Sequence, residues 1–500
     1  MAGETIAIIG AGLAGLAAGV YAQMNGYRAH IFEHHSQPGG VAATWRRGAY
    51  TIEGGIHFLM GHRQGNHMYD LYRKLGTAAP GSVVDMEDYG RFVDETSGRI
   101  ITLSSDLDRL AADLKAFSPA DAGAIEDLVA CGKAMRGPEL WSVGMGDPPE
   151  LAPWWGQLQQ LWALRRVFRF YGGKFGRPVA EFTQSFHDPW LRQVVNNLFM
   201  PEVPVWFVGM LLGLLADRQM GLLVEGSHGF VQPIVHKFKS LGGQISYNAT
   251  VEEIVVEDAA AAGVRLADGT VHRSDVVISA ADGHRTIFKL LGGHYADAKT
   301  KARFRDWRLV RPFVMLSFGV AREFPGEPHF TAYLLKEPIQ VGRQTIGGLG
   351  LRIFNYTNRF APAGKSVIQA SFESEWDHWN DLQNRDRSAY DAEKARCAQE
   401  VLRRLDARFP GIGSQVEVTD VATPYTTWRY TRNWQGAYEG WLPTARQIMT
   451  PVPRTLPGLR NFVMAGQWVM PGGGVPPCLV SGKQAIQILC KWHRKPFVAG

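Results

Sequence analysis

Residues 5–15 read TIAIIGAGLAG, and this stretch decides the fold. The run at 5–9 is apolar and suits a buried strand, and the alanine-rich continuation through Gln23 has a helical pattern. Between them, Gly10 permits a tight turn, Gly12 lets the backbone approach a pyrophosphate, and Gly15 lets the helix pack closely on the strand. The stretch therefore predicts a strand, a turn and a helix whose free N–H groups bind a dinucleotide.

A second strand strengthens this prediction. It is expected over 28–32, which reads RAHIF, and it ends on Glu33. A carboxylate at this position accepts hydrogen bonds from an adenosine ribose and repels a 2′-phosphate. A glycine motif alone is weak evidence, but its combination with two strands, a helix and an acid favours a bound dinucleotide over a turn without a ligand. These residues leave both FAD and NAD open.

Glycines elsewhere in the chain separate the two cofactors. They are Gly39, Gly40, Gly466, Gly473 and Gly474. The last three lie near the C-terminus, between an expected strand that starts at 461 and a helical pattern over 482–491. A glycine turn before a helix presents backbone donors, which suits the electron-rich pyrimidine end of a flavin. NAD needs no such second site, so FAD is the expected cofactor.

These motifs resemble those of the phytoene desaturase-type flavoproteins, a family that includes carotenoid isomerases and retinol saturases. Three blocks in the middle of the chain are similar to that family as well: 242–254 (GGQISYNATVEEI), 263–269 (GVRLADG) and 275–282 (DVVISAAD). The resemblance implies that Val251 contacts adenine through its backbone.

Two details near the first glycines concern the site. Many members of the family have an arginine directly after the double glycine, whereas this chain has Val41, so we expect Arg46 or Arg47 to neutralise the pyrophosphate. Residues 53–61 (EGGIHFLMG) are similar to the retinol saturase version of the loop near the flavin, which makes His57 a candidate catalytic residue.

Catalysis by a flavin on a hydrocarbon needs little acid–base help from the protein. His57 could move a proton, because an unperturbed histidine titrates near neutrality, or it could be a buried histidine bonded to the backbone. Residues 428–441 (WRYTRNWQGAYEGW) are dense in aromatic side chains and either form core packing or line the pocket, where Tyr438 and Trp441 are the candidates. The histidine and cysteine spacings predict no metal site.

The composition is that of an ordinary globular protein, with 500 residues, 45% hydrophobic and 20% charged. A net charge of +6 is too small to imply nucleic acid. Four scattered cysteines favour a reducing compartment, so we expect a cytoplasmic protein. No segment is long enough to cross a bilayer, and the apolar run Val205–Ala216 is expected to be a buried or interfacial helix. The oligomeric state stays open.

Positive charge concentrates in residues 151–180. This segment has no Asp or Glu, and it carries Arg165, Arg166, Arg169, Lys174 and Arg177 among many aromatic residues. Such a mixture predicts peripheral contact with an anionic membrane, through which a lipid-soluble substrate could enter. The alternative is a helix packed on the protein with an exposed basic flank.

The fold class is therefore α/β. A discontinuous Rossmann-like FAD-binding domain is expected over 1–62, 220–295 and 455–500. Residues 63–219 are expected to form a helical, membrane-associated region, and residues 296–454 a mixed-sheet substrate domain.

The resemblance implies an FAD-dependent oxidoreductase that acts on carbon–carbon double bonds of an extended apolar substrate such as a carotenoid, a retinoid or another polyene lipid. Desaturation, saturation and cis–trans isomerisation all stay open. A flavin-dependent amine oxidase is a competing hypothesis, although 307–320 contains no lysine of the kind expected near its flavin. A third hypothesis is a non-catalytic flavin-binding lipid carrier.

Overall fold

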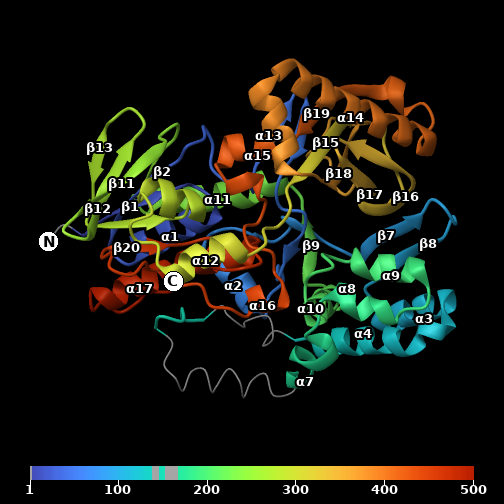
Figure 1. Cartoon of the computed structure of the whole chain (residues 1–500), viewed down its shortest axis with the longest axis horizontal. Coiled ribbons are helices and arrows are strands. Elements are labelled where there is room, and N and C mark those ends of the chain that lie inside the picture. The colour runs from blue at the N-terminus through green and yellow to red at the C-terminus, as the bar shows by residue number, and fades with distance from the viewer. Residues whose placement is uncertain (1–2, 138–145, 152–166) are drawn as a thin grey trace.

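The computed structural model of the chain describes residues 3–137, 146–151 and 167–500 (Figure 1). The expected segment 151–180 is therefore described only in part, and Arg165 and Arg166 lie outside the described residues. Among the residues described, no helix is both long and apolar enough to cross a membrane.

A five-stranded parallel sheet forms the first layer, in the order β10 (Gln244–Ser246), β2 (Arg28–Phe32), β1 (Thr5–Ile9), β14 (Val276–Ser279) and β20 (Phe462–Met464). All five strands lie within 1–62, 220–295 and 455–500, the segments expected to form the FAD-binding domain. The strands β1, β14 and β20 are almost entirely buried, as is usual for a parallel sheet covered by helices, whereas the edge strand β10 is partly exposed.

Three helices accompany this sheet: α1 (Leu13–Met24), α11 (Gly226–Ser240) and α17 (Val475–Trp492). Their close packing depends on glycine. A Cβ on Gly15 would lie 2.0 Å from the carbonyl oxygen of Gly10, and a Cβ on Gly482 would lie 2.4 Å from that of Ala14. Gly482 is therefore the point where α17 crosses α1, inside the helix and not at its start as expected.

Beside the parallel sheet lies a small antiparallel sheet, at the left of Figure 1. It consists of β11 (Val251–Glu257), β12 (Ala260–Leu266) and β13 (Val271–Arg273). It carries Val251 at its first residue, close to the cofactor sheet.

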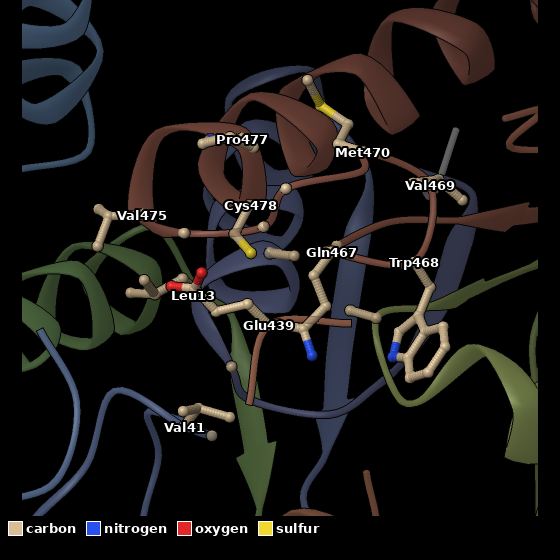
Figure 2. Close-up of a pocket in the computed structure, with 18 of the residues that line it drawn as sticks. Leu13, Val41, Glu439, Gln467, Trp468, Val469, Met470, Val475, Pro477 and Cys478 are labelled. Carbon is tan, nitrogen blue, oxygen red and sulfur yellow. The ribbon is translucent and has the colours of Figure 1, made fainter. Parts of the chain in front are cut away.

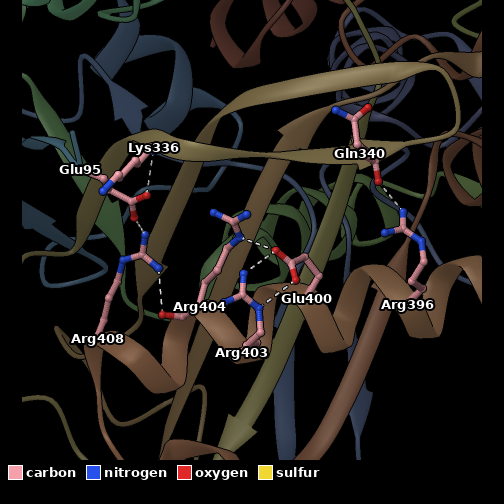
Figure 3. A network of polar contacts seen from close by, with 8 residues as sticks. All are labelled: Glu95, Lys336, Gln340, Arg396, Glu400, Arg403, Arg404 and Arg408. Carbon is pink, nitrogen blue, oxygen red and sulfur yellow. Dashed lines mark hydrogen bonds and ion pairs between the residues drawn. The ribbon is translucent and has the colours of Figure 1, made fainter.

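A seven-stranded mixed sheet forms the other half of the molecule. Its order is β19 (Val416–Ala422), β15 (Phe313–Val320), β18 (Ser366–Glu373), β17 (Gln344–Ile353), β16 (Phe330–Val341), β7 (Asp88–Asp94) and β8 (Ile100–Ser104). Helices α13 (Trp376–Arg385) and α14 (Arg387–Arg408) cover one face, where Trp379, Val401 and Leu405 are buried against it. Figure 3 shows that Arg408 of α14 also pairs with Glu95, next to β7, and that Arg396 donates to the carbonyl of Gln340 in β16.

The segment 63–219 differs from the expected helical region, because β7 and β8 leave it to join the seven-stranded sheet. Its helices are α2 (His67–Lys74), α3 (Leu107–Phe117), α4 (Ala122–Ala134), α7 (Phe168–Tyr171), α8 (Val179–Phe182), α9 (Pro189–Asn196) and α10 (Val205–Ala216). The apolar run expected at 205–216 is α10, which packs on α4. A Cβ on Gly209 would lie 2.5 Å from the sulfur of Cys131, so this helix pair is in close contact.

Short elements complete the described chain. They are the pair β3 (Thr44–Arg47) and β4 (Tyr50–Glu53), the sheet of β5 (Leu59–Met60), β9 (Met220–Leu223) and β6 (Val83–Asp85), the π-helical turn Arg285–Leu290, and helices α12 (Ala298–Asp306), α15 (Pro424–Thr431) and α16 (Ala445–Ile448).

Candidate cofactor and substrate site

A cavity of about 870 Å³ lies at the carboxyl ends of the parallel strands, where open α/β sheets bind their ligands. Its wall includes residues from each glycine motif, from the first strand-ending acid and from the aromatic segment. Among them are Gly10, Gly12, Glu33, Gly39, Gly40, His57, Val251, Tyr438, Glu439, Gly466, Gly473 and Gly474. The cavity therefore brings together segments from both ends and the centre of the chain.

Glu33 marks one end of the cavity. Its carboxylate accepts hydrogen bonds from the backbone N–H of Ala11 at 2.6 Å and of His35 at 2.7 Å, and burial raises its pKa. These bonds hold the carboxylate beside the first glycine turn. Val251 lies on the same wall, and its carbonyl accepts a bond from Arg285 at 3.3 Å.

The start of α1 offers free backbone donors to the cavity. Gly12 is the N-cap, and no side chain caps the helix, so the first N–H groups have no intrahelical or side-chain acceptor. Gly10 has a φ of +93°, which permits the turn, and the N–H of Gly39 donates to the carbonyl of Ala11 at 2.9 Å. An anion fits here, because uncapped N–H groups and the helix dipole both favour negative charge.

The arginines expected to meet that charge do not line the cavity. Arg47 pairs with Asp420 at 2.6 Å and is half exposed, and Arg46 lies beside it on β3. Arg47 is thereby directed toward β19 of the substrate sheet. The arginines on the cavity wall are instead Arg285, Arg432 and Arg454. Burial lowers the pKa of His34, and the charges of Arg432 and Arg285 lower it further.

The second glycine site precedes α17 (Figure 2). The helix begins at Val475, directly after Gly474, and not at Gly482 as the sequence suggested. Gly473 and Gly474 have φ of +53° and +85°, and no side chain caps the helix. The loop before it is fixed by Ser481, whose hydroxyl accepts a bond from the N–H of Gly466 at 2.7 Å. The two uncapped helix starts, of α1 and α17, face one cavity.

Glu439 is a site residue that the sequence analysis missed. Figure 2 shows its side chain extending toward Cys478 and the first turn of α17. Burial raises its pKa to about 7, and no described residue donates a hydrogen bond to its carboxylate. The sequence did carry one signal: an acid inside an aromatic and glycine-rich segment has no evident partner nearby.

His57 and Tyr438 lie together on the cavity wall. Their rings stack with centroids 5.9 Å apart, and the Tyr438 hydroxyl donates to the carbonyls of Gly54 at 2.7 Å and Gly55 at 2.8 Å. Burial, followed by the charge of Arg352, lowers the pKa of His57 well below its ordinary value. His57 is therefore neutral at physiological pH, and it is no cationic acid.

A model of the family described as flavin containing amine oxidoreductase matches residues 13–489. The chain belongs to this family. Its dinucleotide motif and its membership of a flavin-containing family make FAD its cofactor and the chain an FAD-dependent oxidoreductase. The residues of the cavity fit this group, since one uncapped helix start suits a pyrophosphate and the other suits the polar edge of a flavin.

Individual proteins are also similar to this chain. This flavin-containing oxidoreductase is 23% identical over 491 residues to a chloroplastic prolycopene isomerase of Arabidopsis thaliana, covering 95% of this chain and 80% of the relative. It is 28% identical over 343 residues to a lycopene-forming phytoene desaturase of Pseudescherichia vulneris, covering 65% of each chain. A solved oxidoreductase from Methanosarcina mazei shares the fold, with a TM-score of 0.60, 16% identity and coverage of 97% of this chain and all of that one.

Trp441 does not lie on the cavity wall of this oxidoreductase. Its side chain is fully buried, its indole N–H donates to the carbonyl of Trp468 at 3.1 Å, and its ring packs against Phe304 and Trp307. The expectation that it lines the pocket is corrected: Trp441 is core packing. It supports Trp468, which does line the cavity (Figure 2).

Proposed function

We propose that this oxidoreductase acts on carbon–carbon double bonds of an extended apolar polyene, such as a carotenoid or a retinoid. The observation that carries the proposal is the apolar wall that the cavity receives from α10 and nearby segments. It includes Phe58, Met60, Phe199, Trp206, Phe207 and Met210. An extended hydrocarbon is stabilised by burial against such side chains. The relatives named as a prolycopene isomerase and a phytoene desaturase support the same substrate class.

Each group of site residues has a role in binding the cofactor. Gly10, Gly12 and Gly15 shape the turn that holds the pyrophosphate, Glu33 holds the ribose, and the backbone of Val251 meets adenine. Gly39 and Gly40 adjoin the first turn, and Gly466, Gly473 and Gly474 form the flavin edge of the site. When bound, the flavin supplies hydride transfer.

The remaining residues place the polyene and exclude water. His57 and Tyr438 form an aromatic wall that orients a planar chain. Glu439 carries or releases a proton at its carboxylate oxygen near neutral pH, because burial raises its pKa to about 7. Saturation would benefit from a proton donor at this place, since adding a hydride to one carbon of a double bond leaves the other carbon to take a proton.

Anaerobic spectroscopy tests the proposal. Polyene lipids delivered in liposomes to the oxidised holoenzyme should bleach the flavin absorbance if the reaction is a desaturation. Product formed only with pre-reduced flavin would indicate saturation or isomerisation. If no polyene reacts in either state while flavin stays bound, the protein is no polyene enzyme and the lipid-carrier hypothesis gains.

The amine oxidase alternative is less well supported. Strand β15 reads FVMLSFGV and contains no lysine, and Val41 stands where many amine oxidases have an arginine. If primary or secondary amines bleach the flavin and polyenes do not, the amine oxidase hypothesis would be favoured over the polyene hypothesis.

We also propose peripheral contact with an anionic membrane through the basic segment 151–180. In its described part, Phe168 is 59% exposed, and Arg169 and Arg177 are exposed near it. The triple variant F168S/R169Q/R177Q should float less with anionic liposomes than wild type. The double variant K336Q/R343Q removes the same charge from an exposed hairpin and should not change flotation. Equal flotation of all three proteins would contradict this contact.

A further inference from the structure

The guanidinium of Arg352 on β17 lies over the ring of Phe330, 5.9 Å from the ring centroid, but it has no acidic partner among the described residues. It lies on the face of the seven-stranded sheet opposite to α14, where its register neighbours are Phe330 and Gln369. Gln369 on that face donates to the carbonyl of Glu53 at 2.7 Å, so this side of the sheet meets the loop that leads to His57. Within the described chain, the guanidinium of Arg352 makes no hydrogen bond and no ion pair, although protein surrounds it.

Glu53 is a buried acid whose charge would act on Arg352, but its carboxylate already accepts other hydrogen bonds. It accepts from the N–H of Ser227 at 2.7 Å, from the Ser227 hydroxyl at 2.6 Å and from the N–H of Gly55 at 2.8 Å. No oxygen of Glu53 comes within ion-pair distance of Arg352. Glu53 therefore gives Arg352 no hydrogen bond, and the five N–H donors of the guanidinium stay unused among the described residues.

Three other enclosed polar side chains share this condition. His57, His329 and Tyr356 make no side-chain hydrogen bond to any described residue, and each is largely surrounded by protein while keeping some accessible surface. Burial, followed by the charge of Arg352, lowers the pKa of both histidines, and the same charge acts on Tyr356. Buried polar groups in native proteins are nearly always hydrogen-bonded, so four enclosed groups without a side-chain hydrogen bond indicate a ligand or water.

Of these four residues, His57 lines the large cavity, and Arg352 lies on the sheet face that meets the loop leading to His57. A pure hydrocarbon chain would leave these polar groups unsatisfied. A planar carboxylate would match the guanidinium fork with two parallel bonds, and neutral His57 or Tyr356 could donate further.

Resting on the proposed function, we propose that the substrate is a polyene carboxylic acid whose carboxylate binds Arg352. The apolar wall then takes the chain, and Arg352 sets which double bond lies against the flavin. Arg352 is thus a specificity-determining residue, and the acid end distinguishes this substrate from a carotene hydrocarbon.

Two ligands of one skeleton test the inference. Retinoic acid and methyl retinoate differ in the charge of one end, and quenching of tryptophan fluorescence in the holoenzyme gives a dissociation constant for each. Wild type should bind the acid at least ten-fold more tightly than the ester. R352Q should lose this preference and change the ester's affinity less than two-fold. R343Q, which removes a charge from an exposed turn, should keep the preference.

R352K serves as a second variant, because it keeps the charge and loses the fork; it should retain part of the preference. Equal binding of acid and ester by wild type, or an undiminished preference in R352Q, would overturn the inference. Turnover separates it from the proposed function. If polyenes react without a preference for the acid, the proposed function holds and the carboxylate site is wrong. If the preference depends on Arg352 but no polyene is turned over, the carboxylate site holds and the proposed function is wrong.

Discussion

The hydroxyl of Tyr438 lies 2.7 Å from the carbonyl oxygen of Gly54, a residue 384 positions earlier in the chain. The same hydroxyl reaches the carbonyl of Gly55 at 2.8 Å. One side chain thus ties the aromatic segment to the glycine loop that carries His57, and both segments line the cavity. This part of the cavity wall is therefore stabilised by hydrogen bonds as well as by packing.

Replacing Tyr438 with Phe should therefore loosen the wall without removing the ring. The loss leaves two buried carbonyls without this donor, which should lower the free energy of unfolding by about 1–3 kcal/mol. Flavin content should stay normal, and turnover should fall because His57 is held less firmly. Denaturation curves and flavin absorbance measure both. Tyr69, whose hydroxyl makes no hydrogen bond to a described residue, supplies the control, and Y69F should behave as wild type.

Substitutions at Gly12 and Gly15 should have different effects on stability and flavin content. A Cβ on Gly12 meets nothing closer than the Gly40 Cα at 4.0 Å, so G12V should fold but place side-chain atoms in the proposed pyrophosphate site. A Cβ on Gly15 would lie 2.0 Å from the Gly10 carbonyl, so G15A should lose stability as well as flavin. Circular dichroism melts and the ratio of flavin to protein absorbance separate these results. Normal flavin content in G12V would contradict the pyrophosphate assignment.

Glu33 gives an independent check at the other end of the cofactor. E33A removes an acceptor that also fixes the N–H groups of Ala11 and His35, so flavin content should fall strongly. E33Q keeps an acceptor oxygen and the side-chain volume, and it should retain more flavin than E33A. Equal, normal occupancy in both variants would remove Glu33 from the ribose site.

The parts of the fold that were predicted correctly are those that depend on local sequence. The strands at 5–9 and 28–32 and the helix at 205–216 have the expected bounds, because apolar runs bordered by glycine, charge or proline define their own ends. The start of α17 was wrong for a local reason too. Pro476 and Pro477 suit a first helical turn, and that signal outweighs the Ser481–Gly482 pair.

The site was predicted where glycine geometry alone decides it, and not where tertiary contacts do. Arg47 looked available to a phosphate, but a strand pairing turns it to Asp420, 373 residues away. Trp441 looked like a pocket wall, but its indole has a core acceptor. Arg352 lies in an ordinary strand, and its lack of an acidic partner among the described residues becomes visible only once the loop at 53–57 is folded against its sheet face.

Glu439 should make stability depend on pH in a definite direction. Burial raises its pKa from 4.5 to about 7, so the folded state holds a proton that the unfolded state releases. Its contribution to stability is therefore fully present below pH 4.5 and is lost as the pH rises through 7. E439Q cannot ionise, so it should gain roughly 2–3 kcal/mol relative to wild type between pH 5 and pH 8.

The measurement is urea denaturation of flavin-depleted protein at both pH values. Asp282, whose pKa burial also raises to about 7, adds a slope of the same sign to both proteins and cancels in the difference. His57 has the opposite sign, because its lowered pKa costs stability only as the pH falls below 6.5. E375Q, at an exposed position, controls for the loss of one carboxylate. A gain in E439Q that is equal at pH 5 and pH 8 would mean that Glu439 ionises like a surface carboxylate, and it would remove the proton-carrying role assigned to it beside the flavin.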